Sequence, residues 1–125
     1  MTTRILVVED HEDNRRILRD LLTNVGFELI EAVTGPEGVE MAKVHCPDLI
    51  LMDLQLPGID GYEAVRRIKA EPALSSVPIV AVTSYALSGD EEMALAAGCA
   101  AYIAKPYSPR QLLTRIREHL LALET

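Results

Sequence analysis

Five polar residues stand directly after short apolar segments of the sequence, and their types suit phosphoryl chemistry. They are three acids, a hydroxyl residue and a lysine: Glu9, Asp10, Asp53, Thr83 and Lys105. Two carboxylates about 4 Å apart repel by about 4 kcal/mol at an effective dielectric of 20, and one ammonium cannot balance three of them. A divalent cation such as Mg²⁺ would balance them, because it prefers oxygen ligands. A metal, an ammonium and a hydroxyl together stabilise a phosphoryl group in transfer.

The apolar segments before these residues are predicted to be strands of a parallel sheet. Three of them are continuous apolar runs, as expected for strands buried on both faces: 5–8, 49–52 and 79–82. Two weaker segments, 28–32 and 101–104, fit strands at an edge of the sheet. The polar residues therefore mark the carboxyl ends of strands.

Helical patterns lie between the strand segments. One apolar helix stripe consists of Ile17, Leu18, Leu21, Leu22 and Val25. Gly26 follows it at the position that often terminates a helix. Capping-box sequences predict two more helix starts, at Thr34 and at Ser108, and segments 61–70 and 89–97 complete a set of five helices.

The alternation of five strands and five helices predicts an α/β fold, an open parallel sheet with helices on both faces. The 125 residues suit one domain, residues 1–125, with no output domain. Ligands of such sheets bind outside the carboxyl ends of the strands. Each polar residue alone would more often be a solvated turn residue or a cap, but their joint placement favours a functional site.

The composition narrows the class of protein. The chain is 49% hydrophobic and 25% charged, with a net charge of −7, which is typical of a compact soluble domain and disfavours binding to nucleic acid. The longest apolar run, 93–104, is shorter than the roughly 18–20 residues of a membrane span, so we expect a cytoplasmic protein without membrane contact. Cys46 and Cys99 form no pair typical of a disulfide scaffold or zinc site.

The sequence resembles the receiver domains of bacterial two-component response regulators from about residue 4 to residue 121. The resemblance rests on an ordered set of short motifs: Glu9-Asp10, the segment 52–61 (MDLQLPGIDG), Val82-Thr83-Ser84, Tyr102 and Lys105-Pro106. It implies a flavodoxin-like (βα)5 fold with a five-stranded parallel sheet of order 2-1-3-4-5. It also implies a cis peptide bond between Lys105 and Pro106.

The resemblance implies a role for each acidic residue. Asp53 would be the nucleophile that takes a phosphoryl group from a phosphohistidine and becomes an acyl phosphate. Asp10, Asp53 and the backbone carbonyl of Gln55 would bind Mg²⁺, and Glu9 would act largely through water. The protein would catalyse only its own phosphorylation and dephosphorylation and would otherwise not be an enzyme.

The resemblance also implies a switch. Lys105 would pair with one phosphoryl oxygen and Thr83 would hydrogen-bond another. Tyr102 would turn inward as Thr83 moves toward the phosphoryl group. Further donors would be the backbone amides of Leu54 and Ser84. Gln55 and Tyr85 occupy positions that vary in the family, and we hypothesise that these two bulky side chains screen the acyl phosphate from water and lengthen its life.

The implied partners are proteins. A sensor histidine kinase or a histidine phosphotransfer protein would donate the phosphoryl group. A downstream protein target would bind the face formed by the fourth helix, the fifth strand and the fifth helix, where Tyr102 lies. The protein would be a stand-alone regulator similar to the chemotaxis regulators, and a monomer or a homodimer that forms on phosphorylation.

Two other functions remain possible on the residues alone. A phosphatase of the haloacid dehalogenase kind also uses an aspartate after a strand, but it carries a second aspartate where Gln55 stands. A flavodoxin-like flavin carrier would need a phosphate-binding loop after the first strand, where the sequence 9–13 is acidic instead. A degenerate receiver is disfavoured because Asp53, Thr83 and Lys105 are all present.

Overall fold

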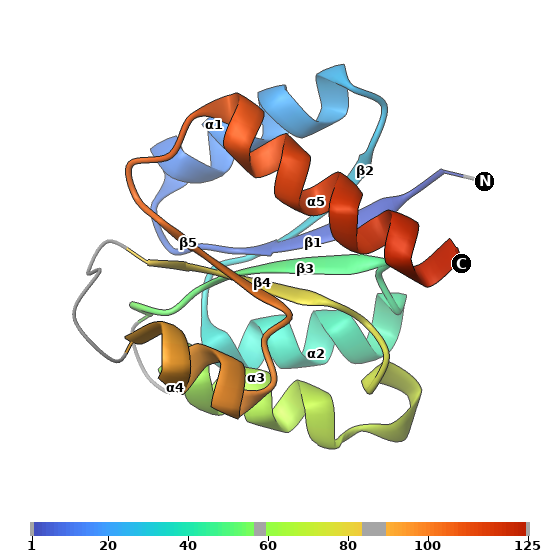
Figure 1. Cartoon of the computed structure of the whole chain (residues 1–125), viewed down its shortest axis with the longest axis vertical. Coiled ribbons are helices and arrows are strands. Elements are labelled where there is room, and N and C mark those ends of the chain that lie inside the picture. The colour runs from blue at the N-terminus through green and yellow to red at the C-terminus, as the bar shows by residue number, and fades with distance from the viewer. Residues whose placement is uncertain (1, 57–59, 84–89, 125) are drawn as a thin grey trace.

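The computed structural model describes residues 2–56, 60–83 and 90–124, and within them five strands alternate with five helices (Figure 1). The strands are β1 (Arg4–Val8), β2 (Glu28–Ala32), β3 (Leu49–Asp53), β4 (Ile79–Thr83) and β5 (Ala101–Ala104). The helices are α1 (Glu12–Asn24), α2 (Gly35–His45), α3 (Gly61–Ala70), α4 (Asp90–Ala97) and α5 (Pro109–Glu124), with a short 3-10 helix, η1 (Pro72–Leu74), after α3. The strands form one parallel sheet in the order β2-β1-β3-β4-β5, which confirms the predicted fold.

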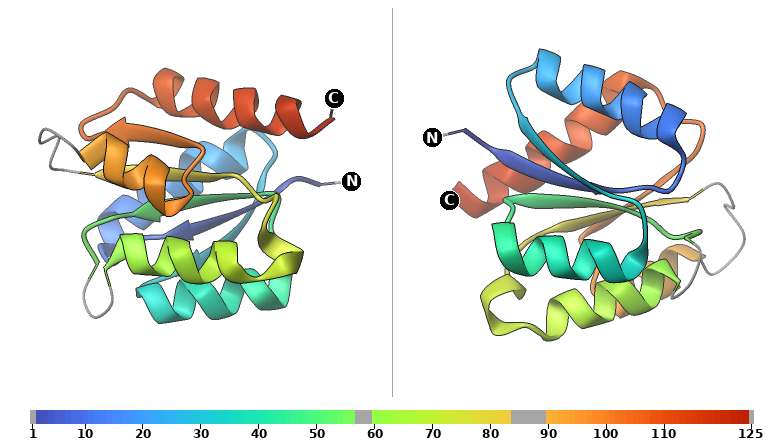
Figure 2. Two further views of the ribbon diagram at one scale, coloured as in Figure 1. Left: turned by 60° about the horizontal axis from the view of Figure 1, so that its bottom comes forward. Right: turned by 180° about the vertical axis from the view of Figure 1, so that it is seen from behind.

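The sheet separates two hydrophobic cores. α1 and α5 cover one face of it, and α2, α3 and α4 cover the other (Figures 1 and 2). Successive residues of β1 divide between the two cores, because side chains of a strand alternate in direction: Ile5 and Val7 pack toward α1 and α5, and Leu6 and Val8 pack toward the other helices. Burial on both faces explains why the central strands are continuous apolar runs.

The predicted capping boxes form at both helix starts. Thr34 Oγ1 accepts a hydrogen bond from the backbone N–H of Glu37 at 3.2 Å, and the Glu37 carboxylate accepts from the backbone N–H of Val33 at 2.9 Å. At the start of α5 the Ser108 hydroxyl accepts from the backbone N–H of Gln111 at 3.1 Å, and the Gln111 side chain accepts from the backbone N–H of Ser108 itself at 3.0 Å, whereas at α2 the second donor is Val33, one residue before the cap. These bonds satisfy backbone donors that the first helical turn leaves free.

The apolar stripe of α1 is narrower than the sequence predicts. Leu18 and Leu22 are buried, but Ile17 is 61% exposed and Val25 is 37% exposed. Adjacent helix positions differ by about 100° in direction, so Ile17 points away from the sheet when Leu18 faces it. The prediction that Ile17 belongs to the buried stripe is wrong. Of the predicted helix 89–97, Gly89 lies outside the described residues, and α4 is described from Asp90 onward.

Gly61 allows α3 to start directly against the end of β3. A Cβ atom at this position would lie 2.5 Å from the Cα of Leu54 and 2.7 Å from the carbonyl oxygen of Asp53. Both are backbone atoms, which cannot move aside cheaply. The glycine therefore fixes how closely the first turn of α3 approaches the segment that carries Asp53.

None of the described helices is both long enough and apolar enough to cross a membrane.

Candidate functional site

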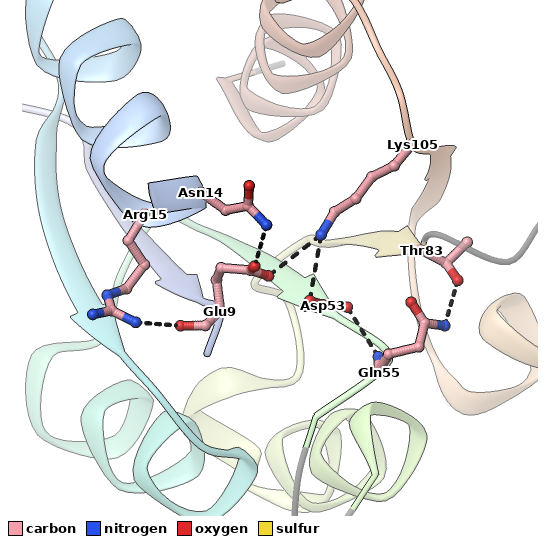
Figure 3. A network of polar contacts seen from close by, with 7 residues as sticks. All are labelled: Glu9, Asn14, Arg15, Asp53, Gln55, Thr83 and Lys105. Carbon is pink, nitrogen blue, oxygen red and sulfur yellow. Dashed lines mark hydrogen bonds and ion pairs between the residues drawn. The ribbon is translucent and has the colours of Figure 1, made fainter. Parts of the chain in front are cut away.

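The parallel strands bring the predicted site residues to one edge of the sheet (Figure 3). Val8 pairs with Met52, so the residues that follow them, Glu9 and Asp53, become neighbours. Asp53 pairs in turn with Val82 of β4. Glu9, Asp10 and Asp53 each offer a carboxylate oxygen, and these atoms all lie within 4.8 Å of one another.

Lys105 places its ammonium between two of these acids. Its Nζ atom lies 3.4 Å from Oδ2 of Asp53 and 3.5 Å from Oε2 of Glu9. Glu9 is 3% exposed and Asp53 is 5% exposed, so both interactions are shielded from water. The peptide bond between Lys105 and Pro106 is cis, which confirms that prediction.

Gln55 forms hydrogen bonds with both Asp53 and Thr83. Its backbone N–H donates to Oδ1 of Asp53 at 2.9 Å, and its side-chain amide donates to Oγ1 of Thr83 (Figure 3). Thr83 is fully buried. The backbone amide of Leu54, expected as a further phosphoryl donor, donates instead to the carbonyl oxygen of Val82 at 3.0 Å and continues the pairing of β3 with β4.

The two buried acids are coupled electrostatically. Burial, followed by the hydrogen bond and the charge of Glu9, raises the pKa of Asp53 to about 7, although the Gln55 N–H and Lys105 act in the opposite direction. Burial also works to raise the pKa of Glu9, but hydrogen bonds with Asp53 and Asn14 and the charge of Lys105 outweigh it, and that pKa is lowered. The raised pKa of Asp53 shows that Lys105 alone does not offset the cost of two buried negative charges at neutral pH.

Asp10 carries an oxygen that fits a metal ligand. Its Oδ1 atom is buried and has no hydrogen-bond partner within the described part of the chain. A buried polar atom without a partner costs about 1–3 kcal/mol, and more if it is charged. A divalent cation bound by the three carboxylates would satisfy this oxygen and offset the excess negative charge, so the residues present suit Mg²⁺.

Tyr102 lies on β5, one strand away from Thr83. It is half-buried and packs against the core on the side of α2, α3 and α4. It also lines an open groove of about 680 Å³ between β5 and α5, together with Arg110 and Arg115. Ser84 and Tyr85, singled out in the sequence, lie outside the described residues.

Three residues beside the site were missed by the sequence analysis, and two of them lie in the first turn of α1. Asn14 Nδ2 donates to Oε1 of Glu9 at 2.7 Å, and Arg15 Nη1 donates to the backbone carbonyl of Glu9 at 3.0 Å (Figure 3). Tyr107 is a third addition, because it lines a small cavity beside Glu9 and Asp53. The available signal was their closeness in sequence to Glu9 and to Lys105.

Comparison with known proteins identifies close relatives over the whole fold. The family model for the response regulator receiver domain matches residues 5–117. The polar-differentiation response regulators DivK of Brucella ovis and Brucella anthropi are 42% and 41% identical to this chain over 120 residues, which cover 96% of this chain and 98% of each relative.

Solved structures show the same architecture. The receiver domain of the sensor histidine kinase PA1611 from Pseudomonas aeruginosa, described with a magnesium ion coordinated in its active site cleft, superposes with a TM-score of 0.89 at 36% identity and covers 96% of this chain and 98% of that one. A CheY-like response regulator receiver domain protein from Methanospirillum hungatei superposes with a TM-score of 0.91 at 33% identity, covering 99% and 98%.

Proposed function

Because this chain belongs to the response regulator receiver domain family of two-component signalling, we propose that it is a phosphorelay regulator that is phosphorylated on Asp53. The observation that carries the proposal is the convergence of three carboxylates and the Lys105 ammonium at the carboxyl edge of the sheet. The family assignment disfavours the phosphatase and the flavin carrier. As a receiver domain, the protein signals and catalyses only the gain and loss of its own phosphoryl group.

Asp10, Asp53 and the backbone carbonyl of Gln55 would hold Mg²⁺, and Glu9 would act through water. The unpartnered Oδ1 of Asp10 and the mutual distances of the acids support this assignment. When bound, the metal supplies positive charge to the acids and to the phosphoryl oxygens. The magnesium ion described in the Pseudomonas receiver domain supports the same choice of metal.

Asp53 is the proposed nucleophile. One of its carboxylate oxygens forms a bond to the phosphorus of a donor phosphohistidine while the phosphorus–nitrogen bond breaks. The electron pair of the broken bond stays with the imidazole, which leaves as the neutral ring after protonation. Lys105 already lies 3.4 Å from Oδ2 of Asp53, close enough to pair with an oxygen of the incoming group.

Thr83 and Tyr102 are the proposed switch residues. The Thr83 hydroxyl, buried and in contact with Gln55, would turn toward a phosphoryl oxygen, and Tyr102 would follow it inward. The face of α4, β5 and α5 would then change shape and bind a downstream protein. The groove lined by Tyr102 and α5 lies on this face.

The proposed partners follow from this chemistry. A sensor histidine kinase or a histidine phosphotransfer protein would donate the phosphoryl group, in the cytoplasm. Residues 1–125 would act as one receiver domain whose output is protein–protein contact, as a monomer or as a homodimer that forms on phosphorylation. The DivK relatives, matched over nearly their whole length, are themselves response regulators.

The test is phosphorylation by acetyl phosphate. We expect the wild-type protein to gain one phosphoryl group in intact mass when Mg²⁺ is present and none when it is chelated. Asp53→Asn should gain none, and Asp20→Asn, a matched change at an exposed position of α1, should behave as wild type. Undiminished labelling of Asp53→Asn would refute the assignment of the nucleophile.

A further inference from the structure

Consecutive residues of α1 hold Glu9 at both its side chain and its main chain. The Asn14 amide donates to Oε1 of the carboxylate at 2.7 Å, and the Arg15 guanidinium donates to the backbone carbonyl at 3.0 Å. The backbone N–H of Glu9 in turn donates to the carbonyl of Ala32 at 3.0 Å. Figure 3 shows the Asn14 side chain at the carboxylate of Glu9 and the Arg15 side chain at its backbone carbonyl.

The Glu9 carboxylate lies closer to Asn14 than to Lys105. Oε1 lies 2.7 Å from Asn14, whereas Oε2 lies 3.5 Å from Lys105. Glu9 is 3% exposed, so water cannot replace a lost donor cheaply. Without Asn14, the carboxylate would be free to rotate toward Lys105, which would draw the ammonium away from Asp53 and the carboxylate away from the acidic cluster.

The position of Asn14 is itself fixed by ion pairs between α1 and β2. Arg15 Nε lies 3.6 Å from Oε1 of Glu31, a residue of β2. Arg19, one turn later, binds both oxygens of the same carboxylate at 2.8 and 2.7 Å. This paired geometry is directional, and it fastens the first turns of α1 to the sheet.

A neutral donor is the suitable choice at this position. A lysine or arginine would also hold the Glu9 carboxylate, but its charge would repel a divalent cation a few ångströms away and lower the affinity for it. An amide holds the carboxylate without adding charge to a site that must attract a cation. The short bond, the burial of its partner Glu9 and the neutral charge of the amide together distinguish Asn14 from an ordinary polar residue of a helix surface.

We infer that Asn14 is a positioning residue for the magnesium site: through its hydrogen bond to Oε1 it sets the orientation of the Glu9 carboxylate toward Asp10 and Asp53. The inference rests on the proposed function of the acidic cluster as a Mg²⁺ site. Groups that orient the residues of a metal site typically change metal affinity by 10–100-fold when they are lost.

The test measures the binding of Mg²⁺ alone to the unphosphorylated protein, by titration calorimetry or by amide chemical shifts. Asn14→Ala is expected to weaken Mg²⁺ binding by about 10-fold. Asn14→Gln, which keeps the amide donor, is expected to recover part of that loss. Asn24→Ala, at the exposed last residue of the same helix, is the matched control and should bind Mg²⁺ as wild type does.

A second pair of variants separates positioning from a general effect on folding. In a Glu9→Ala background the acceptor is absent, so adding Asn14→Ala should change Mg²⁺ affinity no further. An equal loss in both backgrounds, or wild-type affinity in Asn14→Ala, would overturn the inference. If the wild-type protein does not bind Mg²⁺, the proposed metal site is wrong, and the role of Asn14 is then wrong as well.

Discussion

The Nζ atom of Lys105 lies 3.4 Å from Oδ2 of Asp53, although 52 positions separate the two residues in the sequence. The same ammonium lies 3.5 Å from Oε2 of Glu9. Lys105 is therefore shared between two buried acids before any phosphoryl group arrives. A phosphoryl group on Asp53 would add negative charge and so change how Lys105 is shared between the two acids. Lys105 is one residue beyond the end of β5, the strand that carries Tyr102.

Lys105→Ala should separate phosphorylation from its effect on the surface. We expect the fold to persist, because Glu9 and Asp53 keep donors in Asn14 and Gln55. Phosphorylation should no longer shift the amide resonances around Tyr102, since the contact between the phosphoryl group and β5 is lost. Lys43→Ala, in a partly exposed ion pair on α2, is the control and should respond as wild type. A full set of shifts in Lys105→Ala would contradict this role.

Asp53→Asn should stabilise the protein at neutral and higher pH in buffer without Mg²⁺. The pKa of Asp53 is raised from 3.8 to about 7, so between these values the folded protein binds a proton that the unfolded chain has released. Stability therefore falls as the pH rises from about 4 to 7, and above pH 7 the wild type carries the full penalty. Above pH 7 we expect the Asp53→Asn variant to be more stable than the wild type by roughly 1–3 kcal/mol in the free energy of unfolding, measured by urea denaturation.

The difference in stability should shrink as the pH falls from 7 toward 4, because the folded wild type takes up a proton on Asp53 in this range and the buried charge is lost. Added Mg²⁺ should reduce the difference in stability between the two proteins at pH 8, because the ion binds the folded wild type and stabilises that protein by mass action. A difference between the two proteins that does not change with pH would show that the burial of Asp53 is not what destabilises the wild type.

Gln55→Ala should shorten the life of the acyl phosphate. The Gln55 side chain lies against Thr83 beside Asp53, where its bulk would hinder the approach of water to the phosphorus. The decay of the phosphorylated mass after the donor is removed measures this. Gln111→Ala, which removes the same kind of side chain from the cap of α5, should change stability but not decay. Unchanged decay in both Gln55→Ala and Tyr85→Ala would reject the screening hypothesis.

Gly61→Ala should displace the backbone segment that carries Asp53. The added methyl group would lie 2.5 Å from the Cα of Leu54 and 2.7 Å from the carbonyl of Asp53, so the backbone must shift, at a cost of about 1–3 kcal/mol in unfolding free energy. We expect slower phosphorylation as well. Gly26→Ala, strained by a φ of +97° but in open space, should cost about 1–2 kcal/mol and leave the phosphorylation rate unchanged. Equal rates in both variants would contradict the role of Gly61.

The sequence was most informative where residue type and strand position coincide. Glu9, Asp53 and Lys105 could be predicted to meet, because charged residues that follow buried parallel strands must lie at one edge of the sheet. Asn14 was not predicted, since a polar residue in the first turn of a helix is ordinarily solvated, and its closeness in sequence to Glu9 does not show which way its side chain points. Ile17 was misassigned for a related reason: apolar type alone does not give the direction in which a helix packs.

The site of phosphorylation tests the central proposal most directly. Wild-type protein treated with acetyl phosphate and Mg²⁺ would be digested, and the labelled peptide sequenced by mass spectrometry. We expect a single phosphoryl group on the peptide that contains Asp53, and its loss when Mg²⁺ is chelated. A label on any other residue, or no label with Mg²⁺ present, would contradict the proposal that this cluster of acids is a phosphoacceptor site.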